Sequence, residues 1–538
     1  MNSLLALQAF SPDINFAIIL PELILSVVGA LVMLIDAFTT RADTGRGRWI
    51  TGSVSLLGLG AAAAACVWLW VGSTNETQGT FGGMIVLDRM RLSFTFVFLI
   101  VSALTILISM VWVEWENLPG GEFHALLLFA TVGMMLMASG GDLVIIFLGL
   151  ELLSIATYVL AGFRRTDLRS NESSLKYFIL GSFSSAFLLY GIALVYGATT
   201  QAVNVAGRTD FIAGTTNIRE IAARLDTALY PPLLFAGAAM MLVGFGFKIA
   251  TAPFHVWTPD VYEGAPTPVT AFMAAGPKAA GFAAFMRVFL IGFPFVTATS
   301  LTLTSSQAHA AWLNTLYILA ILTMTIGNVA ALVQSNVKRM LAYSSIAHAG
   351  YALVGFIAAG ATDDAAQRND AVAAVVFYLL AYSVMNLGAF AIVTLVARSG
   401  DRRTEIEDYT GIGFRAPALS FALSIFLLSL IGVPLTAGFM GKIMVFRSAL
   451  NLREPYYGLV VIGVLNSAVS VYYYLRLIVV MFFRERTTEW NAPRVPASIA
   501  VALLLTIIGV FYLGVFPGQV LDAFQSEQPA AVNSVAGR

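Results

Sequence analysis

The chain contains an apolar segment, Met241-Leu-Val-Gly-Phe-Gly-Phe-Lys-Ile-Ala-Thr-Ala-Pro-Phe-His255, that is interrupted by one lysine and one proline. Pro253 has no amide hydrogen and clashes with the preceding helical turn, so a helix should break here. Non-helical backbone is tolerated inside a membrane only where it is buried in protein or lines a wet cavity. Lys248 could instead snorkel to the interface, but apolar residues both precede and follow it. The segment therefore predicts a broken transmembrane helix that carries a buried lysine.

The composition of the whole chain agrees with a membrane protein. Of 538 residues, 58% are hydrophobic and 11% charged, and the mean hydropathy is +0.83. A soluble protein carries roughly 25% charged residues, so a set of ordinary soluble domains is excluded. Thirty Lys and Arg residues balance thirty Asp and Glu residues, which removes the charge argument for a nucleic-acid surface. The single cysteine, Cys66, excludes disulfide frameworks and thiolate metal sites, and we interpret it as a packing residue.

Apolar stretches near the ~20 residues that a spanning helix needs follow one another along the chain. We predict an all-α polytopic membrane protein with about fourteen transmembrane helices, near 14–36, 50–72, 92–113, 123–140, 143–163, 175–197, 231–258, 266–292, 311–334, 339–360, 371–397, 417–436 continuing through 438–450, 457–483 and 497–517. The longest polar segment, 198–229, carries as many acids as bases and is interpreted as an external loop or short surface helix.

The basic residues in the loops between the predicted spans indicate how the chain is oriented in the membrane. Fifteen basic residues lie in loops after odd-numbered spans and nine on the opposite side, so the positive-inside rule places both termini outside the cytoplasm. Residues 1–13 have no basic region or cleavage site, so we do not interpret them as a signal peptide. No glycine-rich nucleotide loop follows a strand, and no Cys or His cluster has metal-ligand spacing. We expect no cofactor in this chain.

Lysines are the unusual charges. Of the five in the chain, one, Lys338, is counted with the loops, whereas four fall inside predicted spans: Lys176, Lys248, Lys278 and Lys442. A charge at the bilayer centre costs at least a few kcal/mol. A buried lysine can release its proton, whereas arginine stays charged. Lys278 follows Pro277 and small residues that let a neighbouring helix approach closely.

Glu151 lies near the middle of the fifth span, where an unpaired carboxylate is costly. Lys248 or Lys176 on an adjacent helix is its candidate partner, and a purely structural ion pair is the alternative. Glu22, after Pro21 in the first span, is compatible with either a functional or an interfacial position.

Two histidines have apolar neighbours. His255 and His348 each accompany other titratable groups, and an ordinary pKa near 6.5 suits proton relay. The alternative is a plain core histidine. His309 is interpreted as interfacial, and His124, which lies close to Glu122, as a loop residue.

A short sequence pattern that contains a lysine occurs twice in the chain. The pattern Gly-Phe-x-x-Lys-Ile occurs at 244–249 and at 438–443, and each copy lies near a proline, Pro253 or Pro434. Paired interrupted segments in two halves of a chain indicate an ion site between internal repeats. If spans four to eight and nine to thirteen are repeats, their odd number of helices makes them inverted. We therefore expect discontinuous helices near 248–255 and 434–442.

Two longer motifs resemble a known family. The segment Ala252-Pro-Phe-His-Val-Trp-Thr-Pro-Asp-Val-Tyr-Glu-Gly-Ala-Pro-Thr-Pro-Val-Thr270 and the segment Asn336-Val-Lys-Arg-Met-Leu-Ala-Tyr-Ser-Ser-Ile-Ala-His-Ala-Gly-Tyr351 are similar to the antiporter-like membrane subunits of NADH:quinone oxidoreductase, respiratory complex I. Their details resemble subunit N, the counterpart of mitochondrial subunit 2, more than subunits L or M. The resemblance covers essentially the whole chain, and the departures are the 198–229 insertion and an extended N-terminus.

The resemblance implies a role in proton translocation coupled to quinone reduction elsewhere in the complex. It implies a charged pair of Glu151 with Lys248, assistance from Lys176 and His255, a central relay at Lys278, a link through His348, and a terminal group at Lys442. It further implies that FMN, iron-sulfur clusters and quinone belong to partner subunits, that other membrane subunits are neighbours, and that the location is the bacterial inner membrane.

The expected organisation has four parts: an N-terminal three-helix segment at 1–120, half-channels at 121–295 and 308–485, and a C-terminal helix and tail at 495–538. Two other functions stay open. The chain could belong to an Mrp-type cation/proton antiporter, which is related, or it could be a membrane spacer whose charges only hold helices together.

Overall fold

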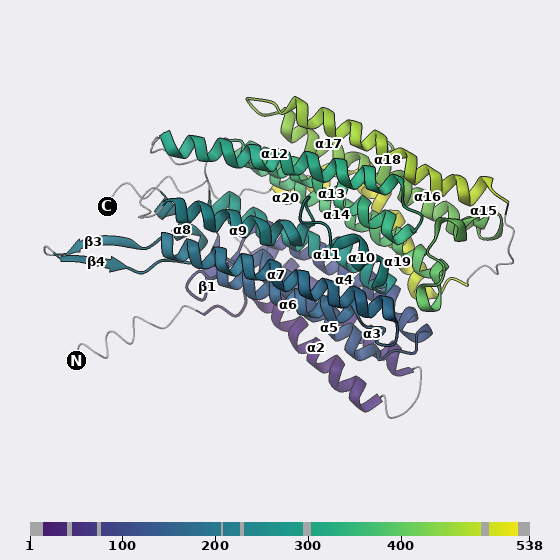
Figure 1. The fold of residues 1–538 in the computed structure, drawn as a ribbon. Coiled ribbons are helices and arrows are strands. Elements are labelled where there is room, and N and C mark those ends of the chain that lie inside the picture. Colours follow the sequence, from purple (N-terminus) through teal and green to yellow (C-terminus); the bar gives the residue numbers. More distant parts are fainter. Residues whose placement is uncertain are drawn as a thin grey trace.

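The structure is a bundle of long helices that run side by side (Figure 1). It is a computed structural model, and it describes residues 14–39, 46–72, 77–205, 208–225, 231–293, 303–485 and 494–525. The segment 1–13, which we expect not to be a signal peptide, lies outside the described residues.

Thirteen helices in the described part of the chain are long and apolar enough to cross a membrane. They are α2 (Leu20–Thr39), α3 (Arg46–Gly72), α4 (Arg89–Trp115), α5 (Gly120–Ser139), α6 (Leu143–Ala161), α7 (Leu168–Ala198), α9 (Pro231–Ile249), α11 (Thr267–Met286, extended by the π-helical η3, Arg287–Gly292), α12 (Leu303–Leu332), α13 (Val337–Gly360), α14 (Ala365–Ala397), α18 (Tyr457–Phe483) and α19 (Ala497–Val515). A fourteenth crossing is divided between α16 (Pro417–Ile431) and α17 (Ala437–Leu450). The predicted all-α polytopic fold is confirmed.

Short elements join or flank the long helices. They are α8 (Ile218–Arg224), α10 (Thr258–Gly264), α15 (Ile412–Arg415), α20 (Pro517–Gln525), η4 (Ser399–Asp401), η5 (Ile406–Tyr409), and the strands β1 (Gln78–Thr80), β2 (Ile85–Leu87), β3 (Gln201–Val205) and β4 (Arg208–Ile212). β3 pairs with β4 in an antiparallel hairpin that extends beyond the helices (Figure 1). The short helix predicted as one alternative for 198–229 is present as α8, but the hairpin in the same segment was not predicted. Valine, threonine and aromatic residues there favour strands.

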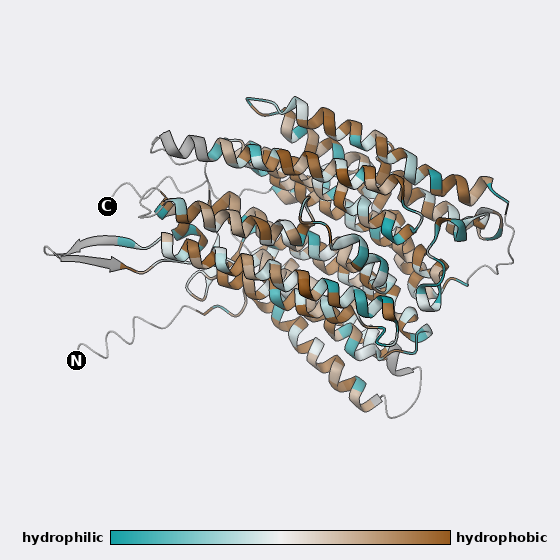
Figure 2. Ribbon diagram, in the orientation of Figure 1, coloured by the Kyte–Doolittle hydropathy of each residue, from teal (hydrophilic) through white to brown (hydrophobic). Residues whose placement is uncertain are grey.

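The most buried helices lie at the centre of the bundle. Every residue of α11 is buried, and the apolar segments of α13 and α14 are 94% and 100% buried. The corresponding segments of α2 and α7 are only 28% and 33% buried. Apolar residues also cover the outer helices (Figure 2), as expected where lipid is the solvent. Cys66 is fully buried, which agrees with packing.

Each of the two predicted repeats contains a pair of helices that cross at close distance, α5 with α6 in the first and α12 with α13 in the second. A Cβ on Gly133 of α5 would lie 2.6 Å from the backbone nitrogen of Leu153 on α6. A Cβ on Gly327 of α12 would lie 2.6 Å from the backbone nitrogen of Ala347 on α13. Glycine is required at both positions because the helix backbones touch. The division at 1–120, 121–295, 308–485 and 495–538 remains our proposal.

Each of these helix sets also contains an interrupted helix. α9 ends at Ile249, Ala250 has a φ of 59°, and α10 begins only at Thr258. α16 ends at Ile431, Gly432 has a φ of 96°, and Leu435 has a φ of 71° before α17 begins at Ala437. The second interruption therefore begins slightly before the predicted range of 434–442 and overlaps its first residues, and Lys442 is inside α17. Non-glycine residues at positive φ are strained, so both interruptions are held by surrounding structure.

Candidate functional site

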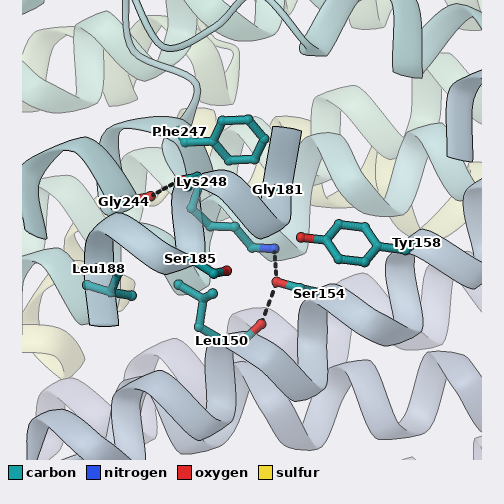
Figure 3. A pocket seen from close by; sticks show the side chains of 10 residues that line it. Leu150, Ser154, Tyr158, Gly181, Ser185, Leu188, Gly244, Phe247 and Lys248 are labelled. Carbon is teal, nitrogen blue, oxygen red and sulfur yellow. Dashed lines mark hydrogen bonds between the residues drawn. The ribbon is translucent and has the colours of Figure 1, made fainter. Parts of the chain in front are cut away.

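Lys248 is the first of the buried lysines along the chain. Its side chain leaves the last turn of α9 and donates from Nζ to Ser154 Oγ of α6 at 2.9 Å (Figure 3). Ser154 in turn donates to the carbonyl of Leu150 at 2.5 Å. Residues of α6, α7 and α9 line a small pocket around the amine, with the hydroxyl of Tyr158 pointing toward it (Figure 3).

Glu151 is placed near this pocket but not on the lysine. It precedes Ser154 by three residues on α6, so the two side chains are neighbours on one helix face. Its Oε1 is buried and has no hydrogen-bond partner in the described part of the chain. No ion pair between Glu151 and Lys248 is formed among the described residues, so the expected pair is separated in this conformation. A buried carboxylate oxygen without a partner is a site for a proton or a water molecule.

Lys278 connects the two sets of helices. It projects from α11 and donates from Nζ to Ser345 Oγ of α13 at 2.6 Å. The ring of Tyr262 lies 5.9 Å from the amine. Because α11 is buried along its whole length, Lys278 is a cationic group in the middle of the molecule.

Lys442 is held at the second interrupted helix. Its Nζ donates to the carbonyls of Leu430 at 3.1 Å and Ile431 at 2.8 Å, and to Ser467 Oγ at 2.7 Å. The two carbonyls end α16 and have no helical partner, because the helix stops there. The negative end of the α16 dipole therefore faces the amine. The ring of Tyr351 lies 5.0 Å from it.

His348 lies on α13 among tyrosines. Its Nδ1 is 2.6 Å from the hydroxyl of Tyr378, and its Nε2 is 3.5 Å from the hydroxyl of Tyr474. The ring of Tyr382 packs against the imidazole at 4.9 Å between centroids. Both ring nitrogens therefore face hydroxyl groups that donate or accept.

Comparison with known proteins agrees with this arrangement. Residues 140–470 match the family model described as NADH:quinone oxidoreductase/Mrp antiporter, TM. NADH-quinone oxidoreductase subunit N of Trichlorobacter lovleyi is 45% identical over 95% of this chain and 96% of its own length. The chain belongs to the NADH-quinone oxidoreductase subunit N family. The resemblance of the two sequence motifs to this family is confirmed.

Solved structures of the family have the same fold. A chain of respiratory complex I from Thermus thermophilus with bound aureothin is 33% identical and covers 93% of this chain and 99% of its own, with a TM-score of 0.71. A chain of the Mrp complex from Dietzia sp. reaches a TM-score of 0.74 over 94% of this chain and 97% of its own at 19% identity. That likeness shows only a shared fold.

Lys176 is not where the sequence predicts it. Its side chain is 42% exposed and pairs with Glu172 at 2.7 Å and Asp260 at 2.9 Å. The alternative that it is the partner of Glu151 is therefore wrong. α7 begins at Leu168, several residues before the predicted span, so Lys176 lies near the polar end of the helix. Its assistance to the subunit N half-channel remains a prediction.

The histidines outside the centre also differ from one another. His255 is half-buried in the interruption after α9, and its Nδ1 has no partner in the described chain. His309 is partly buried near the start of α12, and its Nδ1 likewise has no partner among the described residues. His124 is fully buried inside α5, 3.2 Å from Thr51 Oγ1, so its interpretation as a loop residue is wrong. The helix begins at Gly120, earlier than the apolar pattern indicates.

Glu22 has a structural partner. Its Oε1 lies 2.7 Å from Nη2 of Arg91, and both side chains are buried. Arg91 was counted among the loop charges, but it occupies the first turn of α4. The ion pair connects α2 to α4, and the choice between a functional and an interfacial position for Glu22 stays open.

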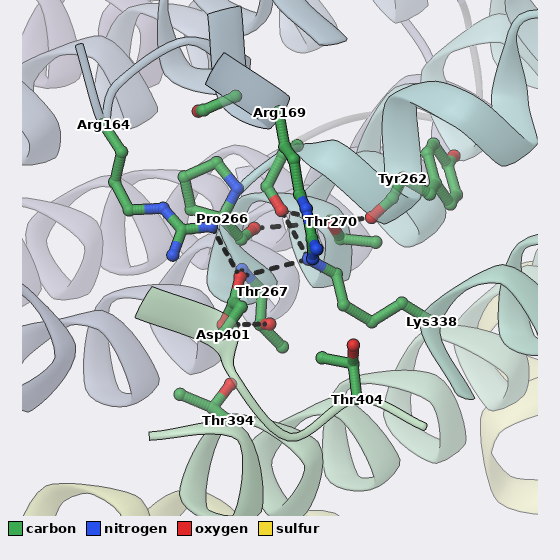
Figure 4. Close-up of polar contacts among 12 residues, drawn as sticks. Arg164, Arg169, Tyr262, Pro266, Thr267, Thr270, Lys338, Thr394, Asp401 and Thr404 are labelled. Carbon is green, nitrogen blue, oxygen red and sulfur yellow. Dashed lines mark hydrogen bonds and ion pairs between the residues drawn. The ribbon is translucent and has the colours of Figure 1, made fainter. Parts of the chain in front are cut away.

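A buried charge cluster near the other end of the molecule was missed. Lys338 is fully buried and donates to the carbonyl of Ala265 at 2.5 Å and to Asp401 Oδ2 at 3.1 Å (Figure 4). Arg164 pairs with the same carboxylate at 2.9 Å. Burial alone would raise the pKa of Asp401, but Lys338 and Arg164 hold that pKa below its ordinary value. Asn336, a helix cap before apolar residues, is the signal that could have placed Lys338 inside a helix.

No group of three His, Cys, Asp or Glu side chains is placed to hold a metal ion within the residues that the structure describes. The expectation that cofactors belong to partner subunits stays a prediction.

Proposed function

We propose that this chain is the proton-translocating membrane-arm subunit N of an NADH:quinone oxidoreductase, and that protons pass along its buried lysines. The observation that carries this proposal concerns Lys248, Lys278 and Lys442. All three are buried, and among the described residues none of them pairs with a carboxylate. A buried charge without a counter-ion is costly, so each of these amines is suited to give up a proton.

Serine hydroxyls provide the contacts through which the lysines exchange protons. Ser154, Ser345 and Ser467 each accept a hydrogen bond from one of the three lysines. A hydroxyl accepts a bond from an ammonium and donates one to a neutral amine. Each serine therefore stabilises its lysine before and after the proton leaves.

The coupling step is a change in pairing between Glu151 and Lys248. In this structure the carboxylate is separated from the amine, which is bonded to Ser154. An approach of Glu151 would stabilise the ammonium, and its departure would release the proton toward Lys278. One pKa unit corresponds to about 1.4 kcal/mol, and moving a charge against the potential costs ~2.3 kcal/mol per 100 mV. A change of a few pKa units in a desolvated pair is sufficient.

We assign no redox chemistry to this chain. FMN, iron-sulfur clusters and quinone are held by partner subunits, and the neighbours in the membrane are another antiporter-like subunit and small membrane subunits. The protein lies in the bacterial inner membrane with both termini outside the cytoplasm. Removing the buried Arg164 and Lys338 from one side and Arg91 from the other changes the count of loop charges from 15 and 9 to 13 and 8, so the bias keeps its direction.

The test uses Lys248→Ala in the assembled complex. We expect the complex to assemble but to lose most proton translocation, measured as the proton-to-electron ratio in membrane vesicles oxidising NADH. Arg447→Ala is the control, because that arginine is exposed in the last turn of α17. Pumping by Lys248→Ala at the wild-type ratio would overturn the proposal. Loss of assembly and pumping together in equal measure would support a spacer instead.

A further inference from the structure

The side chains of α13 form a polar stripe between two of the proposed proton-carrying lysines. Ser345, His348 and Tyr351 follow one another at intervals of three residues, so they share one face of the helix. Lys278 is bonded to Ser345 at one end, and Lys442 lies over the ring of Tyr351 at the other. At 1.5 Å per residue the stripe is ~9 Å long, too far for the two amines to exchange a proton directly.

His348 occupies the middle of this stripe, and Tyr378 contacts both His348 and α17, the helix that carries Lys442. The hydroxyl of Tyr378 is 2.6 Å from Nδ1 of His348. The ring of Tyr378 packs against α17 at Gly441, where an added Cβ would lie 2.9 Å from Cδ2 of the ring. Gly441 immediately precedes Lys442. The tyrosine therefore bridges from the histidine on α13 to the backbone beside the lysine on α17.

The other nitrogen of His348 faces a different pair of hydroxyls. Nε2 is 3.5 Å from the hydroxyl of Tyr474, which is hydrogen-bonded to Ser344. Ser344 lies on α13 one turn before His348. An imidazole with a hydroxyl at each nitrogen takes up a proton on one side and releases it on the other.

We propose that Tyr378 is a proton-carrying residue between His348 and Lys442. This inference rests on the proposed function and adds a residue to its second half. Tyr474, which is hydrogen-bonded to Ser344, faces the opposite nitrogen of His348, where the proton enters.

The proton balance of the step is simple. A proton that leaves Lys278 binds Nε2 of neutral His348, the nitrogen that faces the hydroxyl of Tyr474, and forms an imidazolium. Nδ1–H then passes its proton to the oxygen of Tyr378. Among the described residues no hydrogen bond joins the hydroxyl of Tyr378 to the amine of Lys442, so the hydroxyl proton of Tyr378 moves to that neutral amine through a water molecule. Tyr378 stays a phenol, Lys442 becomes an ammonium, and rotation of the imidazole restores the starting tautomer.

The experiment is Tyr378→Phe in the assembled complex, with Tyr409→Phe as its control. Tyr409 is also fully buried, and its hydroxyl has no hydrogen-bond partner among the described residues. We expect Tyr378→Phe to lower the rate of proton translocation at least tenfold, since positioned proton transfer contributes ~10²–10⁴-fold. The solvent deuterium isotope effect on turnover should rise in Tyr378→Phe alone, a readout that a packing defect would not change.

The outcomes separate this inference from the proposed function. Wild-type pumping by Tyr378→Phe together with loss in Lys278→Ala would overturn the role of Tyr378 only. Wild-type pumping by both would overturn the proposed function. If Tyr378→Phe does not assemble, His348→Gln serves instead, because glutamine hydrogen-bonds but does not relay a proton. Wild-type pumping by His348→Gln would overturn the inference.

Discussion

At the scale of single residues, the three proposed proton-carrying lysines, Lys248, Lys278 and Lys442, have similar surroundings. Each is bonded to a serine on a neighbouring helix, and Lys442 is additionally bonded to two carbonyls that end α16. Hydroxyls and carbonyls solvate an amine without fixing its charge, whereas a carboxylate would hold the proton in place. The unpaired oxygen of Glu151 near Lys248 shows what the first lysine lacks in this conformation.

Replacing Ser154 by alanine tests whether this solvation matters. Lys248 loses its hydrogen-bond acceptor, so we expect proton translocation by the complex to slow at least about tenfold, the effect of roughly 1.5–3 kcal/mol for a hydrogen bond to a charged group. Ser498→Ala is the matched control, because Ser498 is buried and its Oγ has no partner in the described chain. The rate is measured by dye quenching in vesicles, and equal rates for both variants would contradict the prediction.

The residue scale is also where the sequence is least informative. It singles out the lysines because a cation is rare in an apolar span, and it finds the interruptions because proline and glycine have fixed backbone effects. It does not identify Ser154, Ser345 or Tyr378, because serine and tyrosine are ordinary in such spans and their partners lie on other helices. Lys176 was predicted inside a span but is partly exposed, whereas Lys338 was assigned to a loop but is buried. Both errors arise because each lysine lies close to a helix end, and the capping residues Asp167 and Asn336 set those ends.

At the scale of elements, the close helix crossings depend on glycine. Gly133→Ala would place a Cβ 2.6 Å from the backbone nitrogen of Leu153 and push α5 away from α6, which carries Glu151 and Ser154. Overpacking of this kind costs about 1–3 kcal/mol. We therefore expect a lower thermal unfolding temperature for the complex in detergent. Gly60→Ala, on α3 with nothing within 4 Å of the added carbon, should leave it unchanged or slightly higher.

The apolar pattern predicts the elements themselves well because a membrane permits so few solutions. Thirteen helices and one interrupted pair match the fourteen predicted spans. The β1–β2 pair and the β3–β4 hairpin were not predicted. The β3–β4 hairpin extends beyond the helices and is therefore free of this constraint (Figure 1).

At the scale of the whole molecule, an ion pair and a buried hydrogen bond to a carboxylate hold the two ends of the helix formed by α11 and η3. Near its C-terminal end Arg287 binds Asp88 through two bonds of 2.8 and 2.9 Å. At its N-terminal end Thr267 donates to Asp401 Oδ1 at 2.8 Å. Lys278 lies between these two anchors, so the helix that carries the central amine is fixed while side chains move around it.

Of the two contacts that hold the ends of α11, the one at Asp401 gives the clearer test. Its single carboxylate binds Arg164, Thr267 and Lys338, which come from three different segments (Figure 4). Asp401→Asn leaves two buried cations with a neutral partner, and breaking a buried pair costs about 3–5 kcal/mol. Because the pKa of Asp401 is lowered in the folded protein, its contribution is complete above the ordinary value of 3.8 and is lost as the pH falls through the folded pKa. The thermal unfolding temperature of the wild type should therefore fall on acidification below that value, and it should fall more than that of Asp401→Asn. Glu407→Gln, an exposed neighbour, should follow the wild type; identical pH profiles for all three proteins would show that Asp401 does not hold the helices together.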